Sequence, residues 1–181
     1  NFYGTIKITH YWDNYGDTYR LLQNGRITHG YQYKAKDGTE NEWSDRLVTY
    51  YTPGSGVGLA MKLLRKPNMR VGVVGLGVGT MAGFAEKGDE YIFYDINPLV
   101  VDLSLDNTDG FNKKKGFTYC VNARARGAKV EIVLGDARLK MEREEKRNFD
   151  LIVLDAFSSD SIPVHLLTNE AMNLYGHHLA E

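Results

Sequence analysis

The pattern of hydrophobic and polar positions divides the chain into two parts. Near the N-terminus, apolar and polar residues alternate over residues 3–10, which predicts a half-buried β-strand. Residues 19–22 are a second candidate strand. A third strand is expected over residues 26–33, after Asn24-Gly25, a dipeptide typical of two-residue hairpin turns. We therefore expect a small antiparallel β-sheet in this part of the chain.

From residue 70 onward, short apolar runs alternate with segments of helical periodicity. The runs predict four buried strands, over residues 71–74, 90–94, 130–134 and 151–154. The other segments predict helices over residues 78–87, 97–105 and 137–146, a polar loop over residues 106–116, and a last helix that begins near Pro163. Before this part, Ser55 is expected to cap a helix over residues 55–66. Strands that alternate with helices in this way form a parallel sheet with helices on both faces.

The two patterns predict the domain organisation. Eight of the 12 tyrosines and both tryptophans lie in the first 51 residues, so the composition changes where the periodicity does. We expect a β-hairpin domain over residues 1–52 and a Rossmann-like α/β domain over residues 53–181. A complete doubly wound sheet normally continues with more strands. We therefore expect a domain that is truncated at its C-terminus, within a longer polypeptide.

Composition and charge narrow the possible functions. The 181 residues include 22 Lys and Arg against 23 Asp and Glu, for a net charge of −1. A balance so close to neutral argues against a nucleic-acid partner. No apolar run approaches the 18 residues of a membrane-spanning helix. A single cysteine, Cys120, cannot form an internal disulfide framework or a cysteine zinc site. These features favour a cytoplasmic location.

Histidine spacing gives no reason to expect a metal site. The five histidines are scattered, and the pair His177-His178 lacks the i, i+4 spacing of a helical metal pair. We expect this pair at the surface, and His165 in a helical first turn that faces solvent.

A glycine-rich loop follows the first strand of the α/β part. Gly75, Gly77 and Gly79 form a G-x-G-x-G pattern, in which glycines allow a sharp turn and a close approach of the backbone to a ligand. The dinucleotide pattern would place its third glycine at residue 80, which is Thr80. The spacing seen here is more common in sites for S-adenosylmethionine. Asp95, 20 residues after Gly75, is placed to accept both hydroxyls of a ribose.

Two further segments carry candidate site residues. Asp136 and Ala137 follow the third strand, where the aspartate can accept a hydrogen bond from an adenine amino group, cap a helix, or do both. Asp155 and Asp160 frame the loop after the fourth strand, at the sheet edge where α/β proteins bind ligands. A carboxylate there can take a proton from an attacking amine.

Taken together, these blocks resemble the spermidine synthase (polyamine aminopropyltransferase) family. The likeness is strongest to spermidine-synthase-like domains that are fused to membrane transporter-like segments. The residues that carry it are Leu22–Ile27, His29–Gln32, Tyr50-Tyr51, Ser55–Ala60, Gly75–Thr80, Gly135–Ala137, Asp150–Pro163 and Val164–Thr168. The resemblance implies a methyltransferase-like Rossmann fold preceded by a small β domain, in a homodimer. It also implies a fused membrane segment outside this chain.

The family's site residues can be assigned to matching positions. By resemblance, Asp95 would bind the ribose, and Asp136 and Ala137 the adenine, of decarboxylated S-adenosylmethionine or S-adenosylmethionine. Asp155 would accept the proton of a small-molecule amine. Asp160, in a longer loop than usual, would hold that amine. Tyr51 joins these two aspartates as a candidate catalytic residue.

Three departures from the family pattern concern the amine-binding half of the site. Val78 stands where the family's glycine loop carries an aspartate that holds the donor's amine. Thr28 replaces a glutamine, for which His29 or Gln32 could substitute. The family's Tyr-x-Glu is Tyr50-Tyr51-Thr52 here, without the acid.

Three functions follow as hypotheses. The first is aminopropyl transfer from decarboxylated S-adenosylmethionine to an amine. The second is methyl transfer from S-adenosylmethionine, which Val78 favours. The third is a non-catalytic domain that senses an adenosyl nucleoside for an attached membrane part.

Overall fold

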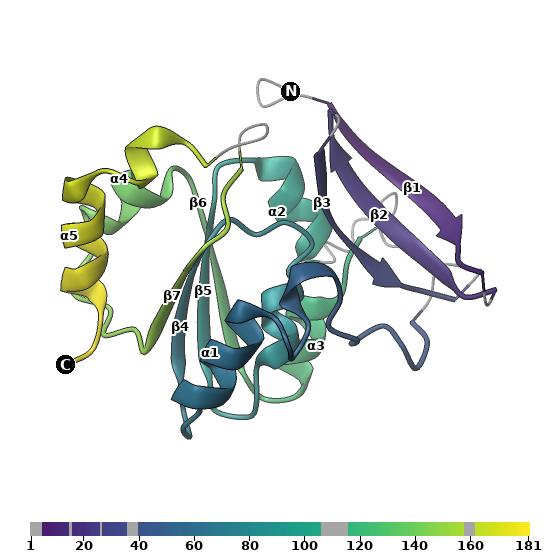
Figure 1. Cartoon of the computed structure of the whole chain (residues 1–181), viewed down its shortest axis with the longest axis horizontal. Coiled ribbons are helices and arrows are strands. Elements are labelled where there is room, and N and C mark those ends of the chain that lie inside the picture. The colour runs from purple at the N-terminus through teal and green to yellow at the C-terminus, as the bar shows by residue number, and fades with distance from the viewer. Residues whose placement is uncertain (1–4, 15, 26, 36–39, 106–115, 158–161) are drawn as a thin grey trace.

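Two β-sheets form the framework of the protein in a computed structural model (Figure 1). The structure describes residues 5–14, 16–25, 27–35, 40–105, 116–157 and 162–181. The first sheet is antiparallel, with strands β1 (Ile6–Trp12), β2 (Thr18–Asn24) and β3 (Ile27–Tyr33) in that order. The predicted hairpin is present, but its turn begins after Asn24, which still pairs with Ile27; Gly25 has the positive φ of 60° that suits such a turn.

The second sheet contains the four predicted strands of the α/β part. All four run parallel, in the order β6 (Lys129–Leu134), β5 (Glu90–Asp95), β4 (Arg70–Val74) and β7 (Leu151–Leu154). Helices cover both faces of this sheet (Figure 1), so side chains on either face of β4, such as Val71, Val73 and Val74, are fully buried. The prediction of an α/β fold with a small antiparallel sheet before it is confirmed. The division at residue 52 and the C-terminal truncation stay predictions.

The helices are short. They are the 3₁₀ turn η1 (Thr49–Tyr51), α1 (Gly56–Leu64), the 3₁₀ turn η2 (Thr80–Phe84), α2 (Pro98–Ser104), α3 (Tyr119–Ala125), α4 (Ala137–Met141), the 3₁₀ turn η3 (Val164–Leu166) and α5 (Asn169–His178). Ser55 caps α1 as predicted, since its hydroxyl accepts a hydrogen bond from the amide of Gly58. Among these described helices, none combines the length and hydrophobicity needed to cross a bilayer.

Three helix predictions were wrong in extent. The helix expected over residues 78–87 is only the turn η2, which is packed so closely that a Cβ on Gly83 would lie 2.6 Å from Leu47 Cδ2. The helix expected over residues 137–146 ends at Met141. The helix expected from Pro163 is divided into η3 and α5, because Thr168 caps a new helix through the amide of Ala171. Helix α3 was not predicted.

His178 corrects the expectation that the His177-His178 pair lies at the surface. Its side chain is fully buried. Nδ1 accepts a hydrogen bond from the amide of Arg147 at 3.2 Å, and Nε2 lies 3.0 Å from the carbonyl oxygen of Met141. The imidazole therefore joins the end of α5 to the connection between α4 and β7.

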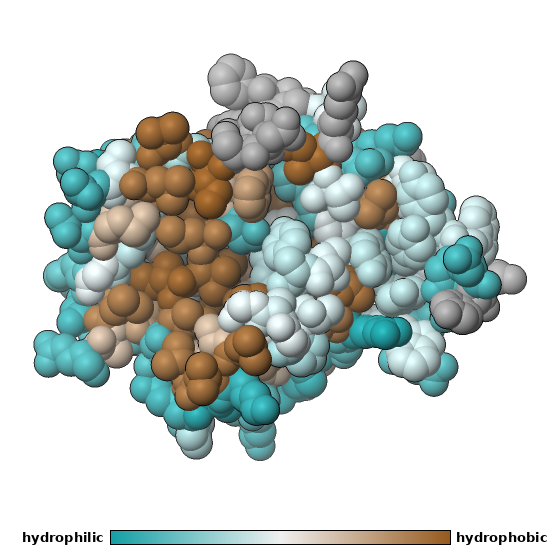
Figure 2. All heavy atoms as spheres, viewed as in Figure 1, coloured by the Kyte–Doolittle hydropathy of each residue, from teal (hydrophilic) through white to brown (hydrophobic). Residues whose placement is uncertain are grey.

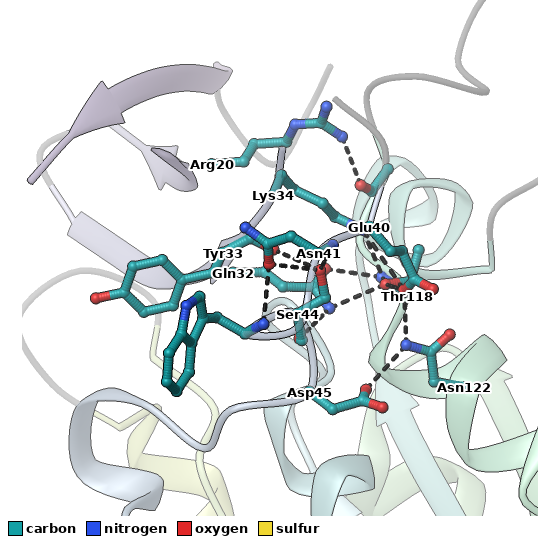
Figure 3. Close-up of polar contacts among 12 residues, drawn as sticks. Arg20, Gln32, Tyr33, Lys34, Glu40, Asn41, Ser44, Asp45, Thr118 and Asn122 are labelled. Carbon is teal, nitrogen blue, oxygen red and sulfur yellow. Dashed lines mark hydrogen bonds and ion pairs between the residues drawn. The ribbon is translucent and has the colours of Figure 1, made fainter. Parts of the chain in front are cut away.

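A polar cluster joins the antiparallel sheet to the start of α3 (Figure 3). The side-chain amide of Gln32 donates to the carbonyl of Ser44 at 2.8 Å and to Thr118 Oγ1 at 3.0 Å, and its oxygen accepts from the amide of Thr118. Lys34 Nζ also donates to Thr118 Oγ1, at 2.8 Å. Gln32 is completely buried in these contacts. Its side chain therefore joins β3 to the start of α3, and the substitution of Gln32 for the family's glutamine stays a prediction.

The parallel sheet has an apolar edge at β7. This strand pairs with β4 on one side, and Phe149, two residues before β7, forms a parallel bridge with Leu179, directly after α5. Figure 2 shows apolar side chains gathered on the face where α5, β7 and α1 lie. The exposed apolar side chains of α1, η3 and α5 include Leu63, Val164 and Met172.

Candidate functional site

The predicted site residues gather at one edge of the parallel sheet. Asp95 ends β5, Asp136 follows β6 by two residues, and Asp155 directly follows β7. Because the strands are parallel, their carboxyl ends share this edge (Figure 1). Backbone hydrogen bonds connect the strand ends: the amide of Gly135 donates to the carbonyl of Asp95 at 2.8 Å, and that of Asp155 to the carbonyl of Val74 at 2.7 Å.

The glycine loop follows β4 and is enclosed by other parts of the chain. Gly75 and Gly77 have positive φ values of 98° and 54°. A Cβ on Gly75 would collide with the backbone carbonyl of Asp155, and one on Gly77 would lie 2.7 Å from the carbonyl oxygen of His29. Gly79, with φ 80°, leads into η2. The loop is therefore packed between the end of β7 and strand β3, which contains His29.

Asp95 uses one carboxylate oxygen to hold the glycine loop and the other to hold the residue that caps α2. Oδ2 accepts a hydrogen bond from the amide of Leu76 at 2.9 Å, and Oδ1 accepts one from Asn97 at 2.8 Å. Burial raises the pKa of Asp95, and these two backbone hydrogen bonds oppose part of the rise. Each oxygen can accept a further hydrogen bond, so the carboxylate can fix the loop and still bind hydroxyl groups.

Asp136 is the N-cap of α4. Its Oδ1 accepts a hydrogen bond from the amide of Leu139 at 3.0 Å. Its Oδ2 lies 2.7 Å from Nε2 of His165 in η3. Ala137, the first residue of α4, is buried beside this pair. The sequence predicted that Asp136 could cap a helix, but it did not predict the contact with His165, which lies 29 residues later in η3.

Asp155 is held by two neighbouring tyrosines of η1. The hydroxyl of Tyr50 donates to Oδ2 at 3.1 Å, and the hydroxyl of Tyr51 donates a short hydrogen bond to the same oxygen. Among the described residues, none donates a hydrogen bond to Oδ1. Burial raises the pKa of Asp155, and the hydrogen bonds from Tyr51 and Tyr50 oppose this. Burial and the nearby carboxylate also raise the pKa values of both tyrosines, so both hydroxyls remain donors.

The backbone of η1 directs the two tyrosines toward Asp155. Thr49 begins this turn with a φ of 58°, a conformation that is rare for a β-branched residue. Strained residues of this kind are held in place by their surroundings and concentrate at functional sites. The two tyrosine rings lie with their centroids 4.8 Å apart, Tyr51 buried and Tyr50 half exposed.

The residues predicted to bind an amine are arranged differently from those predicted to bind a nucleoside. Asp160 lies outside the described residues. Val78 is buried against β3, where a Cβ on Gly30 would come within 2.8 Å of Val78 Cγ2. Burial lowers the pKa of His29, which precedes Gly30. At the position where the resemblance would place an amine-holding aspartate, Val78 therefore makes an apolar contact with Gly30. Within the described residues, no group of three or more His, Cys, Asp or Glu could hold a metal ion.

Comparisons with known proteins identify a structural neighbour. No family model matches the sequence, and no curated protein matches it. A solved structure described as a probable spermidine synthase from Corynebacterium glutamicum ATCC 13032 superimposes with a TM-score of 0.64. The chain has a spermidine-synthase-like fold. The alignment covers 98% of this chain and 60% of the neighbour at 17% sequence identity, so the chain spans about three fifths of the neighbour's length, and the likeness extends to the fold alone.

Proposed function

We propose that the protein is an aminopropyltransferase that uses decarboxylated S-adenosylmethionine as donor and a small amine as acceptor. The observation that carries this proposal is Asp155, a largely buried carboxylate at the ligand-binding edge of the sheet. Its Oδ2 is held by Tyr50 and Tyr51, while Oδ1 accepts no hydrogen bond from a described residue. A carboxylate fixed in this way is suited to accept a proton in one defined direction.

The transfer is a single displacement. The neutral acceptor nitrogen attacks the aminopropyl carbon next to the sulfonium. A carbon–nitrogen bond forms as the carbon–sulfur bond breaks, and its electron pair goes to sulfur, which leaves as 5′-methylthioadenosine. The extra proton on the nitrogen passes to Asp155 Oδ1. Burial raises the pKa of Asp155, which makes the carboxylate a stronger base than an exposed aspartate.

The nucleoside half of the site supports this assignment. Asp95 fixes the glycine loop and has the remaining acceptor capacity for two ribose hydroxyls. Asp136 has similar capacity for the 6-amino group of adenine, beside the buried Ala137. In this assignment the glycines at 75, 77 and 79 let the loop backbone lie close to the nucleoside.

A second candidate is methyl transfer from S-adenosylmethionine. The buried contact between Val78 and Gly30 favours it. The ammonium group of decarboxylated S-adenosylmethionine would lie against the apolar side chain of Val78, without the charge-assisted hydrogen bond that an aspartate supplies. The same fold and the same nucleoside contacts would serve both reactions. Which of the two donors binds more tightly therefore distinguishes aminopropyl transfer from methyl transfer.

Calorimetry with four ligands distinguishes the candidates. The ligands are decarboxylated S-adenosylmethionine, 5′-methylthioadenosine, S-adenosylmethionine and S-adenosylhomocysteine. Tighter binding of the first pair supports aminopropyl transfer, and tighter binding of the second pair overturns it in favour of methyl transfer. Binding of none of the four contradicts a nucleoside site. Binding without turnover of any donor points to a sensor domain.

A further inference from the structure

The carboxylate of Asp136 is fixed from two sides. On one side the amide of Leu139, in the first turn of α4, donates to Oδ1 at 3.0 Å. On the other side Nε2 of His165 lies 2.7 Å from Oδ2. A helix cap requires only one carboxylate oxygen, so the cap alone would leave the other oxygen free to move. The contact from His165 therefore determines where Oδ2 lies.

His165 is itself held by its backbone. Its carbonyl accepts a hydrogen bond from Arg138 Nη1 at 3.1 Å, and the same nitrogen contacts Thr168 Oγ1 at 3.2 Å. Leu166, the next residue, is buried in the core between α4 and α5. The imidazole, in contrast, is half exposed, with 50% of its side-chain surface accessible. An exposed side chain on a fixed backbone contributes little to the core but can position a neighbour.

We propose that His165 is a positioning residue that holds Asp136 toward the 6-amino group of a bound adenosyl nucleoside. The inference rests on the proposed function, because it assumes that Asp136 contacts adenine. Each carboxylate oxygen can accept two hydrogen bonds, so Oδ1 and Oδ2 each keep one position for a ligand. A donor on each oxygen restricts rotation of the carboxylate, which reduces the entropy that adenine binding must remove.

The contact between His165 and Asp136 also relates the proposed adenine-binding residue to the proposed base, Asp155. Turn η3, which carries His165, follows the segment that begins with Asp155. The pair formed by His165 and Asp136 attaches the C-terminal end of this segment to α4. The nucleoside end and the proposed base are therefore joined through one short stretch of chain.

The test is calorimetric titration of the full chain with two nucleosides. One is 5′-methylthioadenosine, and the other is its analogue without the 6-amino group. The variants are His165→Ala and His165→Gln, since a glutamine amide can donate from near the position of Nε2. His177→Ala, which removes an exposed histidine on α5, is the matched control.

We expect His165→Ala to weaken binding of 5′-methylthioadenosine roughly 3–10-fold, the order expected for one lost hydrogen bond. Binding of the analogue should change less than twofold, His165→Gln should recover most of the affinity, and His177→Ala should match the wild type.

An equal loss of affinity for both nucleosides in His165→Ala would overturn the inference, because a general structural effect does not depend on the 6-amino group. Unchanged binding in His165→Ala would overturn it while leaving the proposed function intact. Failure of the wild-type chain to bind either nucleoside would overturn both.

Discussion

Tyr51 donates a hydrogen bond to Asp155 across 104 residues of sequence, and it does so at the oxygen that Tyr50 also contacts. The contact joins η1, which lies between the two sheets in sequence, to the carboxyl end of β7. Two donors on one oxygen orient the carboxylate and leave the other oxygen for chemistry. The proposed base is therefore positioned by residues from outside the parallel sheet.

Removing the hydroxyls of Tyr51 and Tyr50 one at a time tests how much each hydrogen bond lowers the pKa of Asp155. Both hydrogen bonds lower the pKa of Asp155, and Tyr51 has the larger effect. We expect Tyr51→Phe to move the acidic limb of the kcat/KM profile to higher pH, with kcat reduced roughly 10-fold or more. Tyr50→Phe should produce a smaller change in the same direction. Profiles of transfer rate against pH for the three proteins measure this, and an identical acidic limb in all three would contradict it.

The raised pKa of Asp155 predicts a pH dependence of stability. A buried acid with a raised folded-state pKa favours its protonated form, so its contribution to stability falls as pH rises from the ordinary aspartate pKa of about 3.9 through the raised value. Asp155→Asn removes this titration, and its amide oxygen can still accept from the tyrosines.

The variant should therefore gain stability relative to the wild type as pH rises from 4 to 7. Melting curves of both proteins across this range provide the measurement. A gain of about 1 kcal/mol would raise Tm by roughly 2–4 °C. A variant that becomes less stable relative to the wild type as pH rises would contradict the burial of a charged Asp155.

Gly75 provides a test of how the loop is packed. Gly75→Ala would bring a Cβ into the backbone carbonyl of Asp155 and force an L side chain to a φ of 98°. We expect a loss of unfolding free energy of roughly 1–3 kcal/mol and weaker binding of 5′-methylthioadenosine. Gly54→Ala is the control, since a Cβ there meets nothing within 4 Å, and its effect should stay within about 0.5 kcal/mol. Denaturant unfolding that ranks the two variants equally would contradict this packing.

The sequence predicted the parallel sheet well because each strand is a short run of apolar residues bounded by polar ones. It also placed Asp95, Asp136 and Asp155 at one edge, since each closely follows a predicted strand. The helix expected over residues 78–87 was wrong: Val78 packs against Gly30 of β3, and Gly83 against Leu47 and α3, so these positions pack closely without forming an α-helix. An apolar pattern alone therefore does not distinguish an α-helix from a buried segment that forms only a short turn.

The contacts that define the candidate site could not be predicted from the sequence. The hydrogen bonds of Asp155 with Tyr51, and of Asp136 with His165, join elements whose relative placement depends on the packing of the whole domain. His178 illustrates the same point, because a histidine pair near the end of the chain has the composition of an exposed surface and yet one member is buried. Periodicity indicates which residues are buried, but not which polar partners they meet.

The most direct test of the account is a transfer assay with wild-type protein and Asp155→Asn. Each is incubated with decarboxylated S-adenosylmethionine and a panel of small amines, and mass spectrometry quantifies the aminopropylated product and 5′-methylthioadenosine. We predict equal amounts of both products from the wild type, a rate roughly 10²–10⁴-fold lower in Asp155→Asn, and 5′-methylthioadenosine affinities that agree within twofold. Product formation by Asp155→Asn at the wild-type rate would contradict the assignment of Asp155 as the base. Methylated amines formed from S-adenosylmethionine, with no aminopropyl product, would contradict aminopropyl transfer.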